Sequence, residues 1–338
     1  MTFKVDMHTH ILPREWPDYN KKFGYEGFIT LEHQESGLAN MMKHGKLFRA
    51  IEPNTWDPEE RLKDCEKTGV DLQVLSTVPV MFHYWAPAED ALETSMFFND
   101  DIAETCKKYP KKFIGLGTVP LQDPQLSAKE AVRCVKELGL AGVQIGSHIG
   151  EINLDHESLY PFYEACEKVG AAIMVHPWDM MGKETMKDYW LPWLVGMPAE
   201  TSRAICSMIF GGIFNKFPKL RVLFAHGGGS FAHTLGRIEH GFNVRPDLCQ
   251  VKNKIGPREY LGKFWVDSIT HDKRALNTLV EVYGENSVAL GSDYPFPLGE
   301  HHPGKLIEST DYSSQTKSTL LAEAAFEWLG LNIEDYRN

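Results

Sequence analysis

The sequence predicts an α/β protein in which strands and helices alternate and close into a (β/α)8 barrel of the TIM type. Short apolar segments alternate with amphipathic helical patterns along the 338 residues. These segments are continuous apolar runs, which is typical of parallel strands that are covered on both faces. No Gly-x-Gly-x-x-Gly follows the first strand, which disfavours the alternative of a doubly wound, dinucleotide-binding open sheet.

Eight strands are expected where apolar runs end in polar or turn-forming residues, and each is followed by a helix. The expected strands span residues 5–10, 70–78, 113–121, 141–147, 171–176, 220–226, 264–269 and 287–293. The helical patterns span residues 57–69, 88–108, 125–138, 157–169, 199–212, 231–242, 273–283 and 315–329. The first helix has clear boundaries, because Asp57 is a suitable N-cap, Pro58 suits the first helical position and Gly69 ends the pattern.

The segment from about residue 14 to residue 52 interrupts this alternation. It begins where Pro13 and Pro17 mark the end of the first strand, and it is rich in Gly, Lys and His. We expect a small insertion after strand 1, with short strands at 28–31 and 47–51. Residues 1–338 would then form a single barrel domain that carries this insertion.

Composition limits the class of partner and the location. Hydrophobic residues at 43% and charged residues at 24% are typical of a soluble globular enzyme. The net charge of -11 disfavours nucleic acid and anionic membranes as partners, because both require clustered positive charge. Six cysteines without a C-x-x-C pair indicate reduced thiols and a cytosolic location. No targeting segment is visible, and the most apolar later stretch, 204–214, is too short to span a bilayer.

Side chains that can bind a metal end four of the expected strands. His8 and His10 are separated by one residue and therefore share a face of strand 1. His176 ends strand 5, His226 ends strand 6 and Asp293 ends strand 8. Because barrel enzymes keep their chemistry at the carboxyl ends of the strands, we expect these side chains to converge on one metal. Imidazoles with one carboxylate suit zinc, and iron, manganese and cobalt are alternatives.

A site with four protein ligands leaves one of these five side chains for acid-base work. His226 is the expected one, because a neutral imidazole beside a metal-bound water can take and return its proton. We expect Asp6 to face away from the histidine pair and to support the strand, and Gly227-Gly228-Gly229 to allow close backbone packing. The remaining histidines are expected on loops or helices, solvated or in local hydrogen bonds: His33, His44, His83, His148, His156, His233, His240, His271, His301 and His302.

This strand-end pattern resembles the amidohydrolase superfamily of metal-dependent barrel enzymes. Binuclear members usually carry a bridging lysine on strand 4, whereas residues 141–146 read AGVQIG, so the resemblance implies a single metal. Longer strings extend over essentially the whole chain and resemble the family of 2-amino-3-carboxymuconate-6-semialdehyde decarboxylases. They are STVPVMF (76–82), VHPWDM (175–180), WLPWLV (190–195), MPAET (197–201), AHGGG (225–229) and GSDYPFPLGE (291–300).

The resemblance implies non-oxidative decarboxylation of this semialdehyde to 2-aminomuconate 6-semialdehyde in the kynurenine pathway of tryptophan catabolism, which limits quinolinate formation. It implies one Zn²⁺ per chain, with His8, His10, His176 and Asp293 as ligands. His226 and Asp293 would be the catalytic residues, and His226 the acid and base. In the mechanism proposed for the family, metal-activated hydroxide adds to the conjugated substrate, a proton is delivered to the neighbouring carbon and carbon dioxide leaves.

The implied substrate is a dicarboxylate, which cationic side chains should bind. The substrate-binding residues implied by the resemblance are Arg49, Arg237, Lys43 or Lys46, Trp190, Met180 and Phe296. Arg237 lies about seven residues into the helix after strand 6, roughly 10 Å below the catalytic rim at 1.5 Å per residue. We therefore expect Arg237 to serve the active site of the partner chain in a homodimer.

Two other classes of protein fit the same ligands. A metal-dependent hydrolase of a cyclic amide or ester would use the same activated water, and release of carbon dioxide separates the two activities. A non-catalytic metal-binding or scaffold protein would hold zinc without turnover. A spare His226 beside the ligands disfavours this last alternative.

Overall fold

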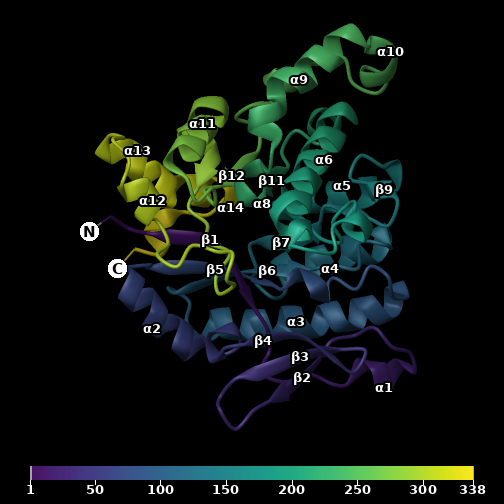
Figure 1. Ribbon diagram of the computed structural model, residues 1–338, viewed down its shortest axis with the longest axis vertical. Helices are drawn as coiled ribbons and strands as arrows, with labels where there is room; N and C mark the ends of the chain where they lie inside the picture. Colours follow the sequence, from purple (N-terminus) through teal and green to yellow (C-terminus); the bar gives the residue numbers. More distant parts are fainter. Residues whose placement is uncertain (1, 338) are drawn as a thin grey trace.

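The computed structural model describes residues 2–337 and contains an eight-stranded parallel sheet surrounded by helices (Figure 1). The strands follow the order β1-β5-β6-β7-β10-β11-β12-β13. The last strand returns to the first, because the Met7 N–H donates to the Leu290 carbonyl at 2.9 Å and the Asp293 N–H donates to the His8 carbonyl at 2.9 Å. The sheet is therefore closed, and the predicted (β/α)8 barrel is confirmed.

All eight barrel strands form at the predicted places. They are β1 (Val5–Ile11), β5 (Leu72–Thr77), β6 (Phe113–Thr118), β7 (Gly142–Gly146), β10 (Ala172–His176), β11 (Arg221–Phe224), β12 (Trp265–Asp267) and β13 (Val288–Ala289). The last three are shorter than predicted. Beyond β13 the chain still follows β1, through an isolated parallel bridge between Thr9 and Tyr294. A hairpin of β8 (His148–Ile149) and β9 (Ile152–Asn153) follows β7.

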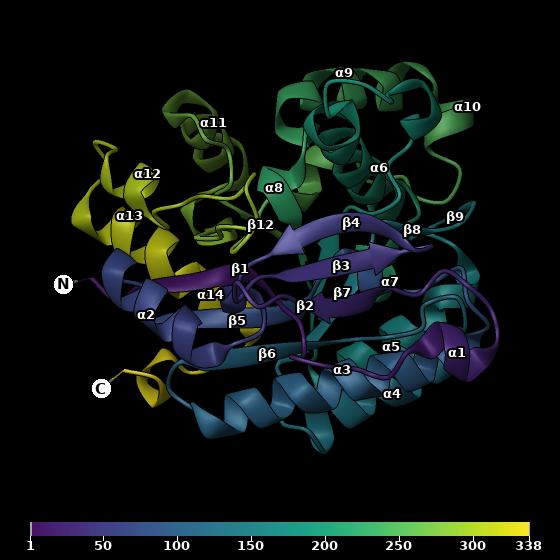
Figure 2. The same cartoon turned by 60° about the horizontal axis from the view of Figure 1, so that its bottom comes forward.

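The helices pack around the sheet, and Figure 2 shows α3 and α4 side by side along its flank. The long helices are α2 (Pro58–Thr68), α3 (Ala88–Lys108), α4 (Pro124–Lys136), α5 (Tyr160–Val169), α6 (Met197–Phe210), α9 (Phe231–Val244) and α11 (Lys273–Tyr283). Short helices are α7 (Ile213–Lys216), α8 (Ala225–Gly228), α10 (Pro246–Cys249), α12 (Lys305–Glu308), α13 (Ser314–Ser318) and α14 (Ala324–Leu329). Within residues 2–337, no helix is both long and apolar enough to cross a bilayer.

Local sequence signals explain where several helices begin and end. The Asp57 carboxylate accepts from the Glu59 N–H at the start of α2, and Gly69 takes a left-handed conformation, with φ of 71°, at its end. The helix predicted at 315–329 is instead interrupted by a π-helical turn, Thr319–Glu323, between α13 and α14. Another π-helical turn, Pro192–Gly196, precedes α6.

The insertion forms helix α1 (Tyr19–Phe23) and a small antiparallel sheet of β2 (Thr30–His33), β3 (Ala39–Lys43) and β4 (Lys46–Ile51). Figure 2 shows this sheet as a separate layer against the barrel. Two of its strands lie near the predicted positions, but β3 (ANMMK) was not predicted, since it is short and has no β-branched or aromatic residue. In this sheet Met41 pairs with Arg49, which places the Arg49 backbone beside the centre of β3.

Apolar side chains fill the barrel below its catalytic end. Met7, Val74, Leu116, Met174 and Leu223 are at most 1% exposed and belong to one core cluster. Trp328 of α14 packs into the same cluster and donates through Nε1–H to the Ile173 carbonyl at 3.3 Å. The interior is therefore a packed core rather than a channel, and the side chains at the carboxyl ends of the strands form the floor of a site at the open end.

Candidate active site

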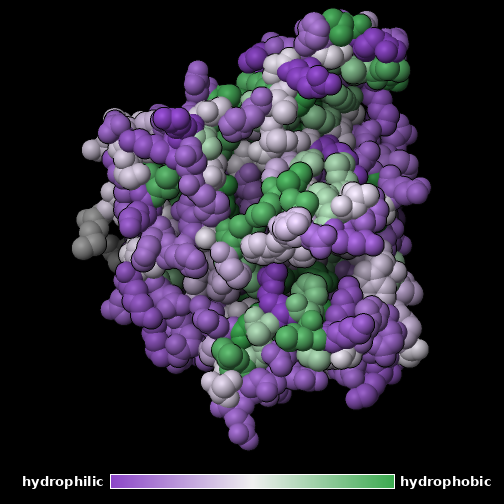
Figure 3. All heavy atoms as spheres, in the orientation of Figure 1, coloured by the Kyte–Doolittle hydropathy of each residue, from purple (hydrophilic) through white to green (hydrophobic). Residues whose placement is uncertain are grey.

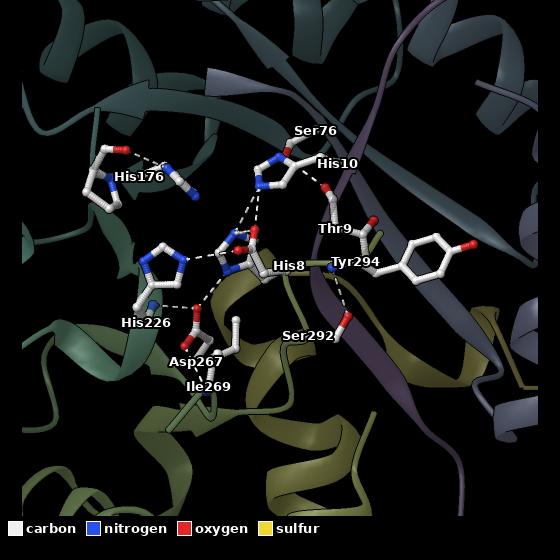
Figure 4. Close-up of polar contacts among 12 residues, drawn as sticks. His8, Thr9, His10, Ser76, His176, His226, Asp267, Ile269, Ser292 and Tyr294 are labelled. Carbon is white, nitrogen blue, oxygen red and sulfur yellow. Dashed lines mark hydrogen bonds and ion pairs between the residues drawn. The ribbon is translucent and has the colours of Figure 1, made fainter. Parts of the chain in front are cut away.

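The five predicted strand-end side chains meet at the carboxyl end of the barrel: Figure 4 shows the four histidines turned toward one another, and Asp293 contacts His10. The Nε2 atoms of His8 and His10 are 3.3 Å apart. Asp293 Oδ1 lies 3.0 Å from His10 Nε2 and 3.5 Å from His8 Nε2. The His176 ring centroid lies 5.1 Å from those of His8 and His10, and 4.9 Å from that of His226.

Three of the histidines are oriented by acceptors behind them. His8 Nδ1 lies 2.7 Å from Asp267 Oδ2, His10 Nδ1 lies 2.9 Å from the Thr77 carbonyl, and His176 Nδ1 lies 2.8 Å from the Pro177 carbonyl. Since a carbonyl or carboxylate oxygen accepts, Nδ1 must carry the proton in each ring. In the neutral rings, Nε2 then offers its lone pair to the centre of the site, which is the arrangement typical of metal-ligating histidines.

The donor set fits one metal ion. The side-chain nitrogens His176 Nε2 and His226 Nε2 are buried and have no hydrogen-bond partner within the part of the chain that the structure describes. Ligand atoms of His8, His176, His226 and Asp293 all lie within 4.8 Å of one another, and His10 adjoins Asp293. Five candidates thus surround one point, so the division into four ligands and one acid-base group stays a prediction.

Burial and neighbouring charges together shift the pKa values of the groups in the site, and not all in the same direction. Burial lowers the pKa of His10, and burial and the neighbouring histidines hold the pKa of His176 well below its ordinary value. Burial also acts to lower the pKa of His226, but the Asp293 carboxylate outweighs it and the pKa is raised. Burial acts to raise the pKa of Asp293, yet contacts with His10 and His226 hold it well below its ordinary value. His226 therefore keeps a proton more readily than His176 does.

Asp267 is a functional residue that the sequence analysis missed. It is fully buried, and besides its contact with His8 it accepts from the backbone N–H groups of His226 and Gly227, both at 2.7 Å. Burial acts to raise its pKa, but the contact with His8 outweighs this effect and the pKa is lowered. The available signal was a carboxylate inside the predicted strand 264–269; the structure ends β12 at Asp267, which places this side chain at the carboxyl end of the barrel.

The chain turns sharply at His226. His226 itself has φ of 56° and Gly227 to Gly229 have φ between 62° and 72°. A Cβ on Gly229 would lie 2.2 Å from the Pro198 carbonyl oxygen, so only glycine fits there. The glycine run therefore allows the close packing that was expected and directs the His226 ring toward the other ligands.

Asp6 is separated from the site by an irregularity in β1. The register between β1 and β5 shifts between Asp6 and Thr9. Arg61 donates to Thr9 Oγ1 at 3.0 Å, and its charge acts on Asp6. Asp6 accepts from Ser292 Oγ at 2.5 Å, and burial raises its pKa to about 7. The hydrogen bond from Ser292 ties β1 to the segment after β13, as a supporting role requires, and the expected orientation of Asp6 away from the histidine pair stays a prediction.

A pocket of about 310 Å³ opens above the metal-type side chains. We call it the mouth pocket; its lining includes His10, His176, Asp293, Lys43, Arg49, Met180, Trp190 and Phe296, and also Trp85, Trp178, Asp179 and Trp193. The Arg49 guanidinium lies over the Phe296 ring at 4.7 Å from its centroid. Burial lowers the pKa values of both Lys43 and Arg49. Figure 3 shows apolar side chains gathered around a hollow near the middle of one face of the molecule.

Not all predicted substrate-binding residues lie in this pocket. Lys43, Arg49, Met180, Trp190 and Phe296 line it, whereas Lys46 is exposed beside it on β4. Arg237 is exposed on α9, outside the lining of the mouth pocket.

Two of the remaining histidines are buried rather than solvated, although His148 makes the expected kind of local contact, between Nδ1 and the Gly150 carbonyl. His83 is 1% exposed and contacts Thr94 Oγ1, and His148 is 5% exposed and lies in the short strand β8. Both are buried because they pack against aromatic side chains, His83 against Phe28 and His148 against Trp178.

Known proteins share this architecture and much of this sequence. The sequence profile described as amidohydrolase matches residues 5–331. The chain is 57% identical to the 2-amino-3-carboxymuconate-6-semialdehyde decarboxylase of Dictyostelium discoideum, over 99% of this chain and 94% of that protein. It is 40% identical to the enzyme of the same name from Caenorhabditis elegans, over 97% of this chain and 94% of that protein.

Solved structures agree on the fold. The 5-carboxyvanillate decarboxylase of Sphingomonas paucimobilis superposes with a TM-score of 0.83 at 23% identity, over 98% of this chain and 100% of that chain. The 5-carboxyvanillate decarboxylase of Novosphingobium aromaticivorans, solved with manganese and a nitrobenzoic acid, has a TM-score of 0.81 at 25% identity, over 98% and 96% of the two chains. The resemblance indicated by the motif strings is confirmed, and the chain belongs to the amidohydrolase family.

Proposed function

We propose that this protein is a metal-dependent carboxy-lyase that converts 2-amino-3-carboxymuconate 6-semialdehyde to 2-aminomuconate 6-semialdehyde in tryptophan catabolism. By consuming this semialdehyde, it would limit quinolinate formation. The observation that carries the proposal is the combination of five converging metal-type side chains with cationic Lys43 and Arg49 in one pocket, in a chain closely related to enzymes of this name. A dicarboxylate that is activated by a metal is the class of substrate that such a pocket fits.

The proposed metal is one Zn²⁺ per chain. His8, His10 and His176 would hold it together with Asp293; the buried Nε2 atom of His176, which has no hydrogen-bond partner among the described residues, is available as a ligand, as is that of His226. When bound, a divalent zinc ion acts as a Lewis acid and lowers the pKa of a coordinated water to about 7. Manganese in a related decarboxylase makes manganese the alternative metal.

Cationic and aromatic side chains would bind and orient the substrate. Arg49 presents a planar fork that can bind a carboxylate through two hydrogen bonds, and its stacking on Phe296 restricts its rotation. Lys43 adds a second positive charge at the same wall of the mouth pocket. Met180 and Trp190 supply apolar surface for the flat, conjugated carbon chain.

His226 would move the proton that the reaction needs. The carbon that loses carbon dioxide must gain a proton, so that its bond to the carboxylate carbon is replaced by a bond to hydrogen. His226 is 3.6 Å from Asp293 Oδ2, and this carboxylate raises the pKa of the imidazole. A protonated His226 can therefore deliver a proton to the substrate and recover it from water.

A direct experiment separates this function from hydrolysis. Purified protein is loaded with zinc and incubated with freshly generated semialdehyde, while loss of its ultraviolet absorbance and release of carbon dioxide are measured together. We expect one carbon dioxide for each substrate consumed, and no activity after the metal is removed by a chelator. Loss of absorbance without carbon dioxide would contradict decarboxylation and favour the hydrolase alternative.

We also propose a cytosolic homodimer in which Arg237 reaches the active site of the partner. The exposed position of Arg237 on α9, outside its own mouth pocket, supports this arrangement. Two inactive variants, His226→Ala and Arg237→Ala, are co-expressed and their mixed dimers isolated. Random mixing makes half of the dimers mixed, each with one intact site of two, so about a quarter of the wild-type activity should return in the unfractionated mixture and about half in the isolated mixed dimers. Mixed dimers without activity would show that Arg237 does not act across the interface.

A further inference from the structure

A buried carboxylate lies just outside the mouth pocket, in a position that neither metal binding nor substrate binding explains. Glu200, in the first turn of α6, is 0% exposed. Its Oε1 accepts from the Met181 N–H at 2.9 Å, and its Oε2 accepts from Ser147 Oγ at 3.1 Å. Arg203 Nη2 lies 3.1 Å from the same Oε2. One carboxylate therefore joins α6, the residue after β7 and the chain that follows β10.

The chain held in this way forms part of the pocket. Residues 178–181, which we call the wall segment, follow β10, and Trp178, Asp179 and Met180 line the mouth pocket. The wall segment belongs to no helix or strand, and Asp179 has φ of 45°. Because no ladder of backbone hydrogen bonds fixes this segment, its position depends on side-chain contacts.

His148 provides a second link between Glu200 and the wall segment. Its Nε2 lies 3.2 Å from the Trp178 carbonyl and 3.3 Å from the Asp179 carbonyl, and its Nδ1 lies 2.8 Å from the Gly150 carbonyl. Glu200 Oε2 lies 3.8 Å from the same Nε2, so His148 stands between the carboxylate and the two carbonyl groups of the wall segment.

Close packing leaves the wall segment little freedom as long as these contacts hold. A Cβ on Gly146 would lie 2.5 Å from Trp178 Cδ1, and a Cβ on Gly196 would lie 2.9 Å from Met180 Cβ. The Trp178 Nε1–H donates to the His148 carbonyl at 2.7 Å. The wall segment is thus packed against glycine backbone on both sides and tied to α6 by Glu200.

We propose that Glu200 is a positioning residue, which holds the wall segment at the distance from the metal ligands that the conjugated substrate requires. Glu200 is not among the residues that line the mouth pocket, so it acts through Met181, from whose N–H it accepts, and through the neighbouring His148. The inference gives a role to the MPAET string and rests on the proposed function only for the identity of the substrate.

The test uses Glu200→Ala and Glu200→Gln, with Glu130→Ala as the matched control. Glu130 is another buried carboxylate, 3% exposed on α4, and it pairs with Arg133 at 2.8 Å outside the mouth pocket. Three properties are measured for each zinc-loaded variant: amide hydrogen exchange of the peptide covering 177–186, the Kd for cis,cis-muconate, and the kinetic constants for the semialdehyde. Zinc content and Tm are measured alongside.

We expect Glu200→Ala to keep its zinc, to exchange faster in this peptide and to bind muconate more weakly. Its kcat/KM should fall by about 10- to 100-fold, because a misplacement of about 1 Å at a site can cost about 100-fold in rate. Glu200→Gln, whose amide oxygen can still accept from the Met181 N–H, should lie closer to wild type. Glu130→Ala should lower Tm without changing exchange in the peptide or muconate affinity.

Unchanged exchange in Glu200→Ala, or the same change in Glu130→Ala, would overturn the proposal. Loss of zinc from Glu200→Ala would also overturn it, because the effect would then pass through the ligands. If Glu200→Ala does not fold, Glu200→Gln decides the question: it loses the ion pair with Arg203 and must still exchange faster than wild type in this peptide, and wild-type exchange would overturn the proposal. If Glu200→Ala exchanges faster than wild type and Glu130→Ala does not, while the wild-type protein fails to consume the semialdehyde, the proposed function is contradicted and the role of Glu200 stands.

Discussion

Asp267→Asn should weaken metal binding, although Asp267 is not one of the proposed metal ligands. The carboxylate accepts from His8 Nδ1–H and from the backbone N–H groups of His226 and Gly227. If the asparagine amide keeps its oxygen toward Gly227, its NH2 group replaces Oδ2 and faces His8 Nδ1. His8 can then accept this hydrogen only by moving its own proton to Nε2, where it blocks the metal.

The expected magnitude follows from this change of tautomer. Loss of such an outer partner typically reduces metal affinity about 10- to 100-fold, or by about 1.4 to 2.8 kcal/mol of binding free energy. Competition with a chromophoric zinc chelator measures the change directly. Asp6→Asn is the matched control, because Asp6 is an equally buried aspartate in β1 itself, and its carboxylate accepts from Ser292 Oγ rather than from the His8 imidazole. An Asp267→Asn protein with wild-type zinc affinity, or an equal loss in Asp6→Asn, would refute the reasoning.

Three further predictions concern the ligands, the substrate and stability. His176→Ala should lose both zinc and activity, whereas His226→Ala should keep most of its zinc and lose only turnover; zinc analysis with the opposite pattern would exchange the two roles. Arg49→Ala should lower kcat/KM for the semialdehyde by about 100-fold or more with little change in Tm, because the two hydrogen bonds from the guanidinium to a substrate carboxylate are lost. Unchanged kinetics with a lowered Tm would show Arg49 to be structural. Burial raises the pKa of Asp6 from 3.8 to about 7, so folding favours its protonated form. Its contribution to the free energy of unfolding is therefore full below pH 4 and is lost as the pH rises toward 7. Metal-free wild-type protein should lose stability relative to Asp6→Asn over this range in urea titrations, and parallel pH profiles would contradict the assignment.

Part of the site could be predicted from the sequence because a parallel barrel brings the carboxyl ends of its strands to one rim. His176 and Asp293 each end an apolar run, and His8 and His10 share one strand. Once the strands are assigned correctly, closure of the barrel brings these side chains together at its carboxyl end. The helix signals at Asp57 and Gly69 were also predictable, because they act within a few residues of the chain.

The tertiary structure decided what depends on contacts between distant residues. Asp267 and His8 are separated by 259 residues, and Glu200 and Ser147 by 53 residues, so no local pattern indicates either contact. The register shift in β1 and the pairing of β3 in the insertion also depend on the neighbouring strands. The amino-acid sequence by itself determined the barrel, its strand ends and the residues able to hold a metal, because these follow from local periodicity. Only the tertiary structure decided which groups orient those residues and fix the pocket wall, because hydrogen bonds in a closed barrel join segments far apart in the chain.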